Sequence, residues 1–128
     1  MRIFKVFSVV FFLVSLGSIA IPARAVDMPD AAKKNGCTAC HTIDKKLVGP
    51  AWMDISKKYK GVKTMSATFT DGKVMKGPPK KVLVAKVKKG GKGNWVNVTG
   101  GVAMPVSPSK VSDADISKLV TFILGLAK

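Results

Sequence analysis

The chain has 128 residues and a formal net charge of +15, with 22 lysines and arginines against 7 acidic residues. This length favours a single domain with a modest hydrophobic core. The chain holds only two cysteines and one histidine. This composition disfavours a four-ligand zinc site and excludes a metal site with two histidine ligands from one chain.

The N-terminal segment has the pattern of a secretory signal peptide. Two basic residues in the first five positions precede a nearly unbroken apolar run over 6–21, and Ala23-Arg24-Ala25 matches an A-x-A cleavage site. We therefore expect residues 1–25 to be removed and a mature domain of residues 26–128 to be exported, in a bacterium to the periplasm. The run is short for a membrane span, so we expect no stable membrane insertion after cleavage; an uncleaved anchor is the alternative.

The positive charge of the mature domain comes from lysine alone. The signal segment contains three of the 22 basic residues and none of the 7 acidic ones, so residues 26–128 carry a net charge of +12. Lysine is a flexible, strongly hydrated point charge, which suits long-range steering toward an acidic protein and weak, transient docking. Solubility alone and attraction to an anionic membrane are the alternatives, whereas export argues against nucleic acid as a partner.

The mature domain begins with a predicted short helix over residues 28–35. A proline near its start, Asp30 at its positive end and Lys33-Lys34 at its other end all suit helix termini. Gly36 then ends the helix or allows close backbone approach before the next motif.

That motif, Cys37-Thr38-Ala39-Cys40-His41, contains both cysteines and the only histidine. A Cys-x-x-Cys-His run is typical of covalent c-type haem attachment, in which two thiols bond to the porphyrin and the histidine binds the iron. A redox dithiol, a zinc site and a structural disulfide are rival interpretations. A dithiol enzyme needs a flanking strand that the sequence lacks, and a disulfide leaves His41 unexplained. We therefore favour one haem c attached through Cys37 and Cys40.

The middle of the chain alternates predicted helices with loops. Residues 42–50 predict a turn-rich loop, and residues 51–60 an amphipathic helix. Residues 62–79 lack clear periodicity and predict an extended surface loop, whereas residues 80–89 predict a short helix. Residues 93–108, rich in glycine, proline and valine, predict a further loop. No segment has a convincing strand pattern.

The last element is the clearest. Ser112 is a good N-cap, and Asp113 and Asp115 follow it at the positive end of the helix. Apolar residues then recur at helical spacing: Ile116, Leu119, Val120, Ile123 and Leu124. This pattern predicts a helix with one buried face.

The second ligand of a haem iron must come from a residue other than histidine, and a methionine thioether is the obvious candidate. Five methionines follow the signal segment: Met28, Met53, Met65, Met75 and Met104. Met104 is the first choice because Pro105 fixes the backbone there and because it lies far enough along the chain to reach the opposite haem face. Met65 and Met75 are the next candidates.

The order of these motifs resembles that of the class I cytochromes c, in particular the small bacterial periplasmic monohaem type. The matching pieces lie at residues 35–41, 47–51, 86–91, 94–95, 104–105 and 111–113. The resemblance implies an all-α fold, with several short helices wrapped around one covalently bound haem. It also implies that the Pro50 carbonyl accepts a hydrogen bond from the His41 ring. It implies that the Trp95 indole binds a haem propionate, for which ordinary packing is the alternative.

Two segments depart from the smallest members of that family. Residues 62–79 are longer and are expected either to cover the propionate edge of the haem or to form partner surface. Met104 follows Trp95 by nine positions, so residues 96–103 must bulge.

The sequence thus predicts a monomeric, soluble electron carrier, not an enzyme, that cycles between Fe(III) and Fe(II) with His41 and Met104 as axial ligands. Its expected partners are respiratory redox proteins with acidic docking surfaces, such as a terminal oxidase, a reductase or a cytochrome complex. One rival is a haem with a labile sixth ligand that binds gases or acts as a peroxidase. Another is a haem subunit of a larger enzyme complex.

Overall fold

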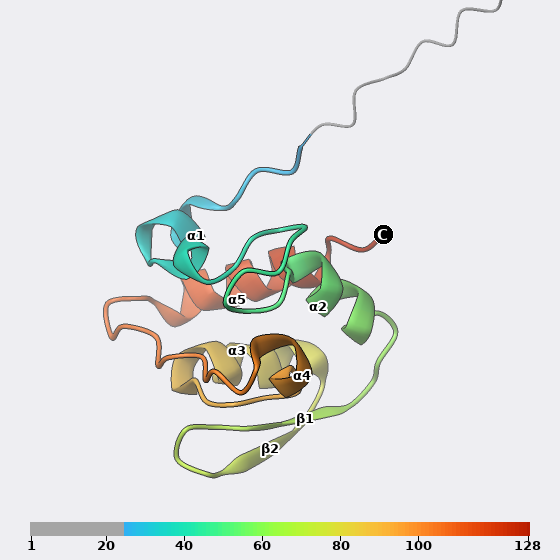
Figure 1. Ribbon diagram of the computed structural model, residues 1–128, viewed down its shortest axis with the longest axis vertical. Coiled ribbons are helices and arrows are strands. Elements are labelled where there is room, and N and C mark those ends of the chain that lie inside the picture. The colour runs from blue at the N-terminus through green and yellow to red at the C-terminus, as the bar shows by residue number, and fades with distance from the viewer. Residues whose placement is uncertain (1–24) are drawn as a thin grey trace, which may run out of the picture.

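The computed structural model describes residues 25–128, so the predicted signal segment, apart from Ala25, lies outside the described residues. Helices make up most of the regular structure (Figure 1). They are α1 (Asp30–Lys34), the 3₁₀ helix η1 (Cys37–Ala39), α2 (Trp52–Tyr59), α3 (Pro79–Lys89), α4 (Val96–Thr99) and α5 (Asp113–Leu124). Within residues 25–128, no helix is long and apolar enough to cross a membrane.

Helix α5 is the element on which the other helices pack. It contacts α1, α2 and α3, and it runs across the molecule above α3 in Figure 1. Its predicted apolar face is buried: Ile116, Leu119, Val120 and Ile123 are each at most 7% exposed. The rings of Phe122 and Trp52 of α2 pack in a T-shaped arrangement, with 6.2 Å between ring centroids. The positions of α1, α2, α3 and α5 therefore confirm the predicted helices, and burial of their apolar faces holds them together.

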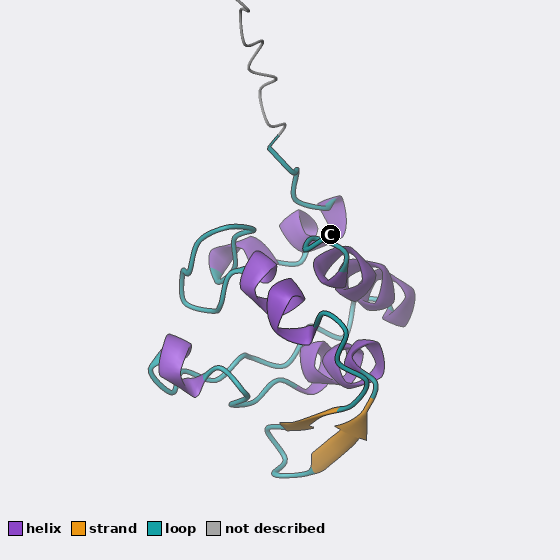
Figure 2. Ribbon diagram, turned by 90° about the vertical axis from the view of Figure 1, so that its right-hand side faces the viewer, coloured by secondary structure: helices purple, strands orange, loops and turns teal. Residues whose placement is uncertain are grey.

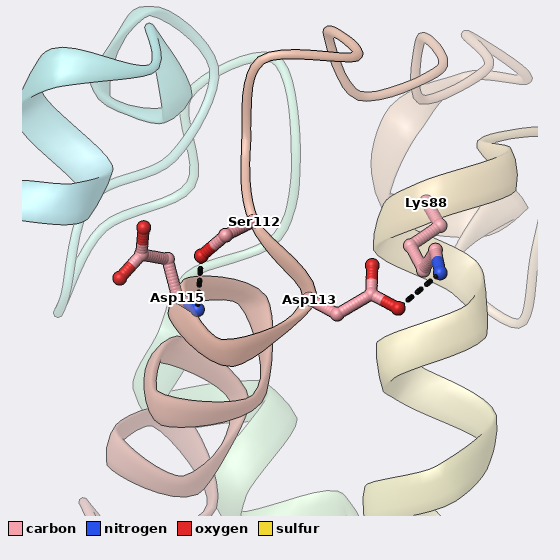
Figure 3. Close-up of polar contacts among 4 residues, drawn as sticks. All are labelled: Lys88, Ser112, Asp113 and Asp115. Atoms are coloured by element: carbon pink, nitrogen blue, oxygen red, sulfur yellow. Dashed lines mark hydrogen bonds and ion pairs between the residues drawn. The ribbon is translucent and has the colours of Figure 1, made fainter.

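The N-terminus of α5 is fixed by two polar contacts (Figure 3). The Ser112 hydroxyl accepts a hydrogen bond from the Asp115 amide at 3.1 Å, as the sequence predicts for an N-cap. The Asp113 carboxylate lies 2.8 Å from the Lys88 ammonium near the end of α3. Exposed ion pairs of this kind contribute about 0–1 kcal/mol, so burial between α3 and α5 contributes more to stability than this contact does.

The prediction that residues 62–79 form a loop, and that the chain has no strand, is wrong. Strands β1 (Met65–Thr68) and β2 (Val74–Gly77) pair antiparallel, with Met65 opposite Gly77. Figure 2 shows this hairpin at one side of the helical body. Along β1, Met65 and Ala67 are buried against the core while the alternate side chains are exposed, which is the period-two pattern of a half-buried strand.

The turn that joins β1 and β2 is formed by Asp71 and Gly72. Asp71 accepts a hydrogen bond from the Lys73 amide, and Gly72 adopts a positive φ of 76°. An Asp-Gly pair is a strong turn signal, but strands of four residues are too short to be recognised without their partner. A two-stranded hairpin is only marginally stable alone, and here it packs on α3.

The predicted loop over residues 93–108 also requires a correction. It contains α4, which closes at Gly100 with a left-handed φ of 63° and an amide that donates to the Val96 carbonyl. This helical turn takes up the chain length that was expected to bulge between Trp95 and Met104.

A buried hydroxyl ties α2 to the C-terminal end of the chain, and its removal should be costly. Ser56 is fully buried, donates to the Leu124 carbonyl at 2.9 Å and accepts from the Ala127 amide at 2.9 Å. We expect Ser56→Ala to lower the free energy of unfolding by about 1–3 kcal/mol, because it leaves two partners without a hydrogen bond. Denaturant unfolding of the holoprotein measures this loss. Thr121→Ala, at an exposed position of α5, is the control, and an equal effect of the two changes would contradict the prediction.

Candidate functional site

The Cys-x-x-Cys-His motif is shaped by η1. Gly36 precedes it in the left-handed conformation with φ 74°, and the Cys40 and His41 amides both donate to the Cys37 carbonyl. In a 3₁₀ helix, side chains three residues apart lie one above the other. The two half-buried cysteine side chains, which are free thiols, therefore face the same cavity as the imidazole.

The His41 ring is oriented by the loop that follows it. Its Nδ1 lies 2.8 Å from the Pro50 carbonyl oxygen. Since a carbonyl only accepts, this contact places the proton of the neutral ring on Nδ1 and leaves the Nε2 lone pair free to bind a metal. Burial lowers the pKa of His41, and the Pro50 contact opposes that shift only in part. The neutral form, which is the form that binds metals, is thus favoured.

The close approach of Gly49 to the imidazole explains why a glycine stands before Pro50. A Cβ at Gly49 would lie 2.8 Å from Nδ1 and 2.9 Å from Nε2 of His41, closer than real side-chain atoms pack. The Gly49 amide also donates to the Cys40 carbonyl at 2.7 Å. The sequence marked Gly49-Pro50 only as a bend, so this contact was not predicted.

Met104 is held by pairing with a glycine at the end of α3. The Gly91 amide donates to the Met104 carbonyl at 2.8 Å, and the Met104 amide donates to the Gly91 carbonyl at 3.2 Å. A Cβ at the neighbouring Gly90 would lie 2.5 Å from the Met104 oxygen. Only glycine, which has no side chain, allows the backbone at position 90 to lie this close to Met104.

All six residues singled out from the sequence line one cavity of about 200 Å³. They are Cys37, Cys40, His41, Pro50, Trp95 and Met104. The remainder of the lining is largely apolar and comes from α2, α3, α5 and the segment around α4. A concave, largely apolar site with a few convergent polar groups is the usual form of a cofactor site.

Of the methionines in the described residues, only Met104 lines this cavity. Met65 lies in the hydrophobic core, and Met75 packs against that core from β2. The two alternative ligand candidates therefore lie on the hairpin and do not line the cavity that His41 lines.

One lysine that the sequence did not single out also lines the cavity. Lys86 of α3 donates from its ammonium to the Thr68 carbonyl at 2.7 Å and to the Lys92 carbonyl at 2.6 Å. Burial lowers the pKa of Lys86. The sequence offered only a weak signal, because Lys86 is one of four lysines among the last residues of α3 and the loop that follows it.

The chemistry of these donors fits a haem. Two thiols with the right spacing stand beside an imidazole with a free Nε2, a thioether lines the same cavity, and the walls are apolar. Among residues 25–128, no group of three or more His, Cys, Asp or Glu side chains could hold a bare metal ion, so this part of the structure offers no zinc site.

Comparisons with known proteins give the family of the chain. Residues 30–127 match the family model described as Cytochrome c. Cytochrome c-551 of Allochromatium vinosum is 44% identical over 95 residues, which is 74% of this chain and 81% of that protein. Cytochrome c-552 of Hydrogenobacter thermophilus is 39% identical over 95 residues, covering 74% and 76%. The crystal structure of wild-type Nitrosomonas europaea cytochrome c552 has a TM-score of 0.57 at 37% identity, covering 76% of this chain and 96% of that one.

Proposed function

Since this chain belongs to the cytochrome c family, as an electron carrier with one haem c attached covalently through Cys37 and Cys40, we propose that His41 and Met104 are the axial ligands of its iron. When bound, haem c supplies an iron that exchanges one electron between Fe(III) and Fe(II). The observation that carries the proposal is that His41 and Met104 line the same apolar cavity.

On the histidine side, the protein's contribution is orientation. The Pro50 carbonyl holds Nδ1 and so leaves the Nε2 lone pair free, while Gly49 leaves room for the ring. A hydrogen bond to the outer nitrogen also makes the imidazole a stronger donor. This fixed orientation of the imidazole would keep rearrangement small during electron transfer.

On the methionine side, the contribution is a neutral sulfur donor on a fixed backbone. A thioether favours the ferrous state and raises the reduction potential. The two hydrogen bonds with Gly91 hold the Met104 backbone, so a thioether bound to the iron would stay in place and would keep small ligands out. This supports the electron carrier over the alternative of a gas-binding or peroxidase-like haem.

The optical spectrum of the purified holoprotein, ferric and ferrous, tests this proposal. We expect a low-spin spectrum in both states and no change when the ferrous protein meets carbon monoxide. A high-spin spectrum, or carbon monoxide binding to the unmodified protein, would instead favour the gas-binding alternative.

We further propose that the protein acts as a monomer in the periplasm, after removal of residues 1–25, and carries electrons between respiratory partners. The support is the signal-peptide pattern, the net charge of +12 on residues 26–128, and the absence of arginine from that part of the chain. The partner surface is proposed to be acidic, because an all-lysine positive field attracts it over long range without forming rigid pairs.

This electrostatic proposal makes a kinetic prediction. Between about 0.01 and about 0.15 M ionic strength the Debye length falls from ~30 to ~8 Å, so we expect the association rate with a redox partner to fall about tenfold or more. Stopped-flow electron transfer at a series of salt concentrations measures it. A rate that is independent of salt would contradict the acidic docking surface.

A further inference from the structure

Lys58, in the last turn of α2, lies against the ring of Trp95. Its ammonium nitrogen is 4.4 Å from the centre of the indole ring, a cation–π contact. The same nitrogen donates a hydrogen bond to the carbonyl of Asn94 at 2.8 Å. Trp95 lines the haem cavity and Lys58 does not, so Lys58 meets the cavity wall through its contact with Trp95.

The residue before Trp95 is also fixed. The Asn94 side-chain amide donates to the Tyr59 hydroxyl at 3.1 Å and to the Ser66 carbonyl of β1 at 2.8 Å. Asn94 thus links the end of α2, the hairpin and the loop that presents Trp95. Together with the Lys58 contacts, these bonds hold one wall of the cavity from outside.

We propose that Lys58 is a positioning residue for Trp95, and that its charge at this wall raises the reduction potential of the haem. Ferric haem carries one more positive charge than ferrous haem, so a nearby cation disfavours the ferric state. The effect is moderate because the Lys58 side chain is exposed to water and salt. The inference rests on the proposed electron-transfer function.

The chain offers a matched control in the preceding residue. Lys57 lies on the same helix and is also exposed. The contacts with the Trp95 ring and the Asn94 carbonyl are made by Lys58 and not by Lys57. Lys57→Gln removes the same charge from the same helix without touching the cavity wall. Lys58→Arg keeps both the charge and the ability to stack on an aromatic ring.

The test is a spectroelectrochemical titration of the holoprotein and of Lys58→Gln, Lys57→Gln and Lys58→Arg. At the wild-type midpoint potential, we expect the ratio of reduced to oxidised protein to fall roughly twofold to fivefold in Lys58→Gln. We expect a clearly smaller change in Lys57→Gln and recovery in Lys58→Arg. Equal falls in the two glutamine variants would overturn the proposal.

A second readout separates positioning from general charge. The chain has two tryptophans, so nitrogen NMR of the ferrous protein gives two indole N–H signals, and Trp95→Phe assigns them. We expect Lys58→Gln to shift the Trp95 signal and leave the Trp52 signal in place. An unmoved Trp95 signal would overturn the positioning role.

The optical spectrum of each sample distinguishes a failure of the Lys58 proposal from a failure of the proposed axial ligation. If the unmodified protein lacks a low-spin spectrum, the axial ligation fails. If that spectrum is present in all variants and the two glutamine variants behave alike, only the role of Lys58 fails.

Discussion

Replacing Met104 with alanine is expected to convert the low-spin holoprotein into a high-spin one that binds carbon monoxide when reduced. The substitution removes the thioether from the cavity that it shares with His41. The weak red absorption band of methionine bound to ferric iron should disappear. The reduction potential should fall by an amount on the order of 0.1 V, within the roughly 0.8 V range that axial ligands span, because the donor that favours ferrous iron is lost.

Met75→Ala is the matched control for that experiment. Met75 is half-buried on β2, packs against the core and does not line the cavity. Its loss should lower the free energy of unfolding by about 2 kcal/mol and leave the red band and the potential unchanged. If the band survives Met104→Ala and disappears in Met75→Ala or Met65→Ala, the methionine has been assigned wrongly.

The second large effect is expected at Gly90, which is not a proposed ligand of the iron. Gly90 has φ 63° and ψ −154°, a conformation that side chains rarely adopt. A Cβ there would lie 2.5 Å from the Met104 carbonyl oxygen and 2.8 Å from Pro105. Gly90→Ala should therefore push the Met104 backbone away from Gly91. We expect a loss of about 1–3 kcal/mol in stability together with a weakened red band.

Gly72→Ala separates these two consequences. Gly72 also has a positive φ, of 76°, but a Cβ there would meet nothing within 4 Å. The change should cost stability through backbone strain alone and leave the ligation intact. Thermal unfolding and the ferric spectrum of both variants measure the contrast. A normal red band in Gly90→Ala would contradict the view that the Gly91 pairing positions Met104.

The helices could be predicted because their signals are local. Ser112 caps α5, and the apolar residues that follow recur at helical spacing. Helix α5 can therefore be recognised from about fifteen residues of sequence. The hairpin was missed for the opposite reason. Its strands are four residues long, and the burial of Met65 and Ala67 depends on α3, which comes later in the chain.

The candidate site likewise has features that the sequence predicts and features that it does not. The Cys-x-x-Cys-His motif carries its own spacing, so haem attachment could be predicted from five residues. The contact of Gly49 with His41, the pairing of Gly91 with Met104, and the Lys58 charge on Trp95 join segments whose meeting depends on loop conformation. No periodicity in the sequence encodes such contacts.

The most direct test of the account is NMR of the ferrous holoprotein with its methionine methyl groups labelled. A methyl group bound next to the iron lies over the porphyrin face, where the ring current shifts its resonance far upfield. We predict one such methyl signal, absent in Met104→Leu and present in Met65→Leu and Met75→Leu. An upfield signal that survives Met104→Leu, or no upfield methyl in the unmodified protein, would contradict His41/Met104 ligation.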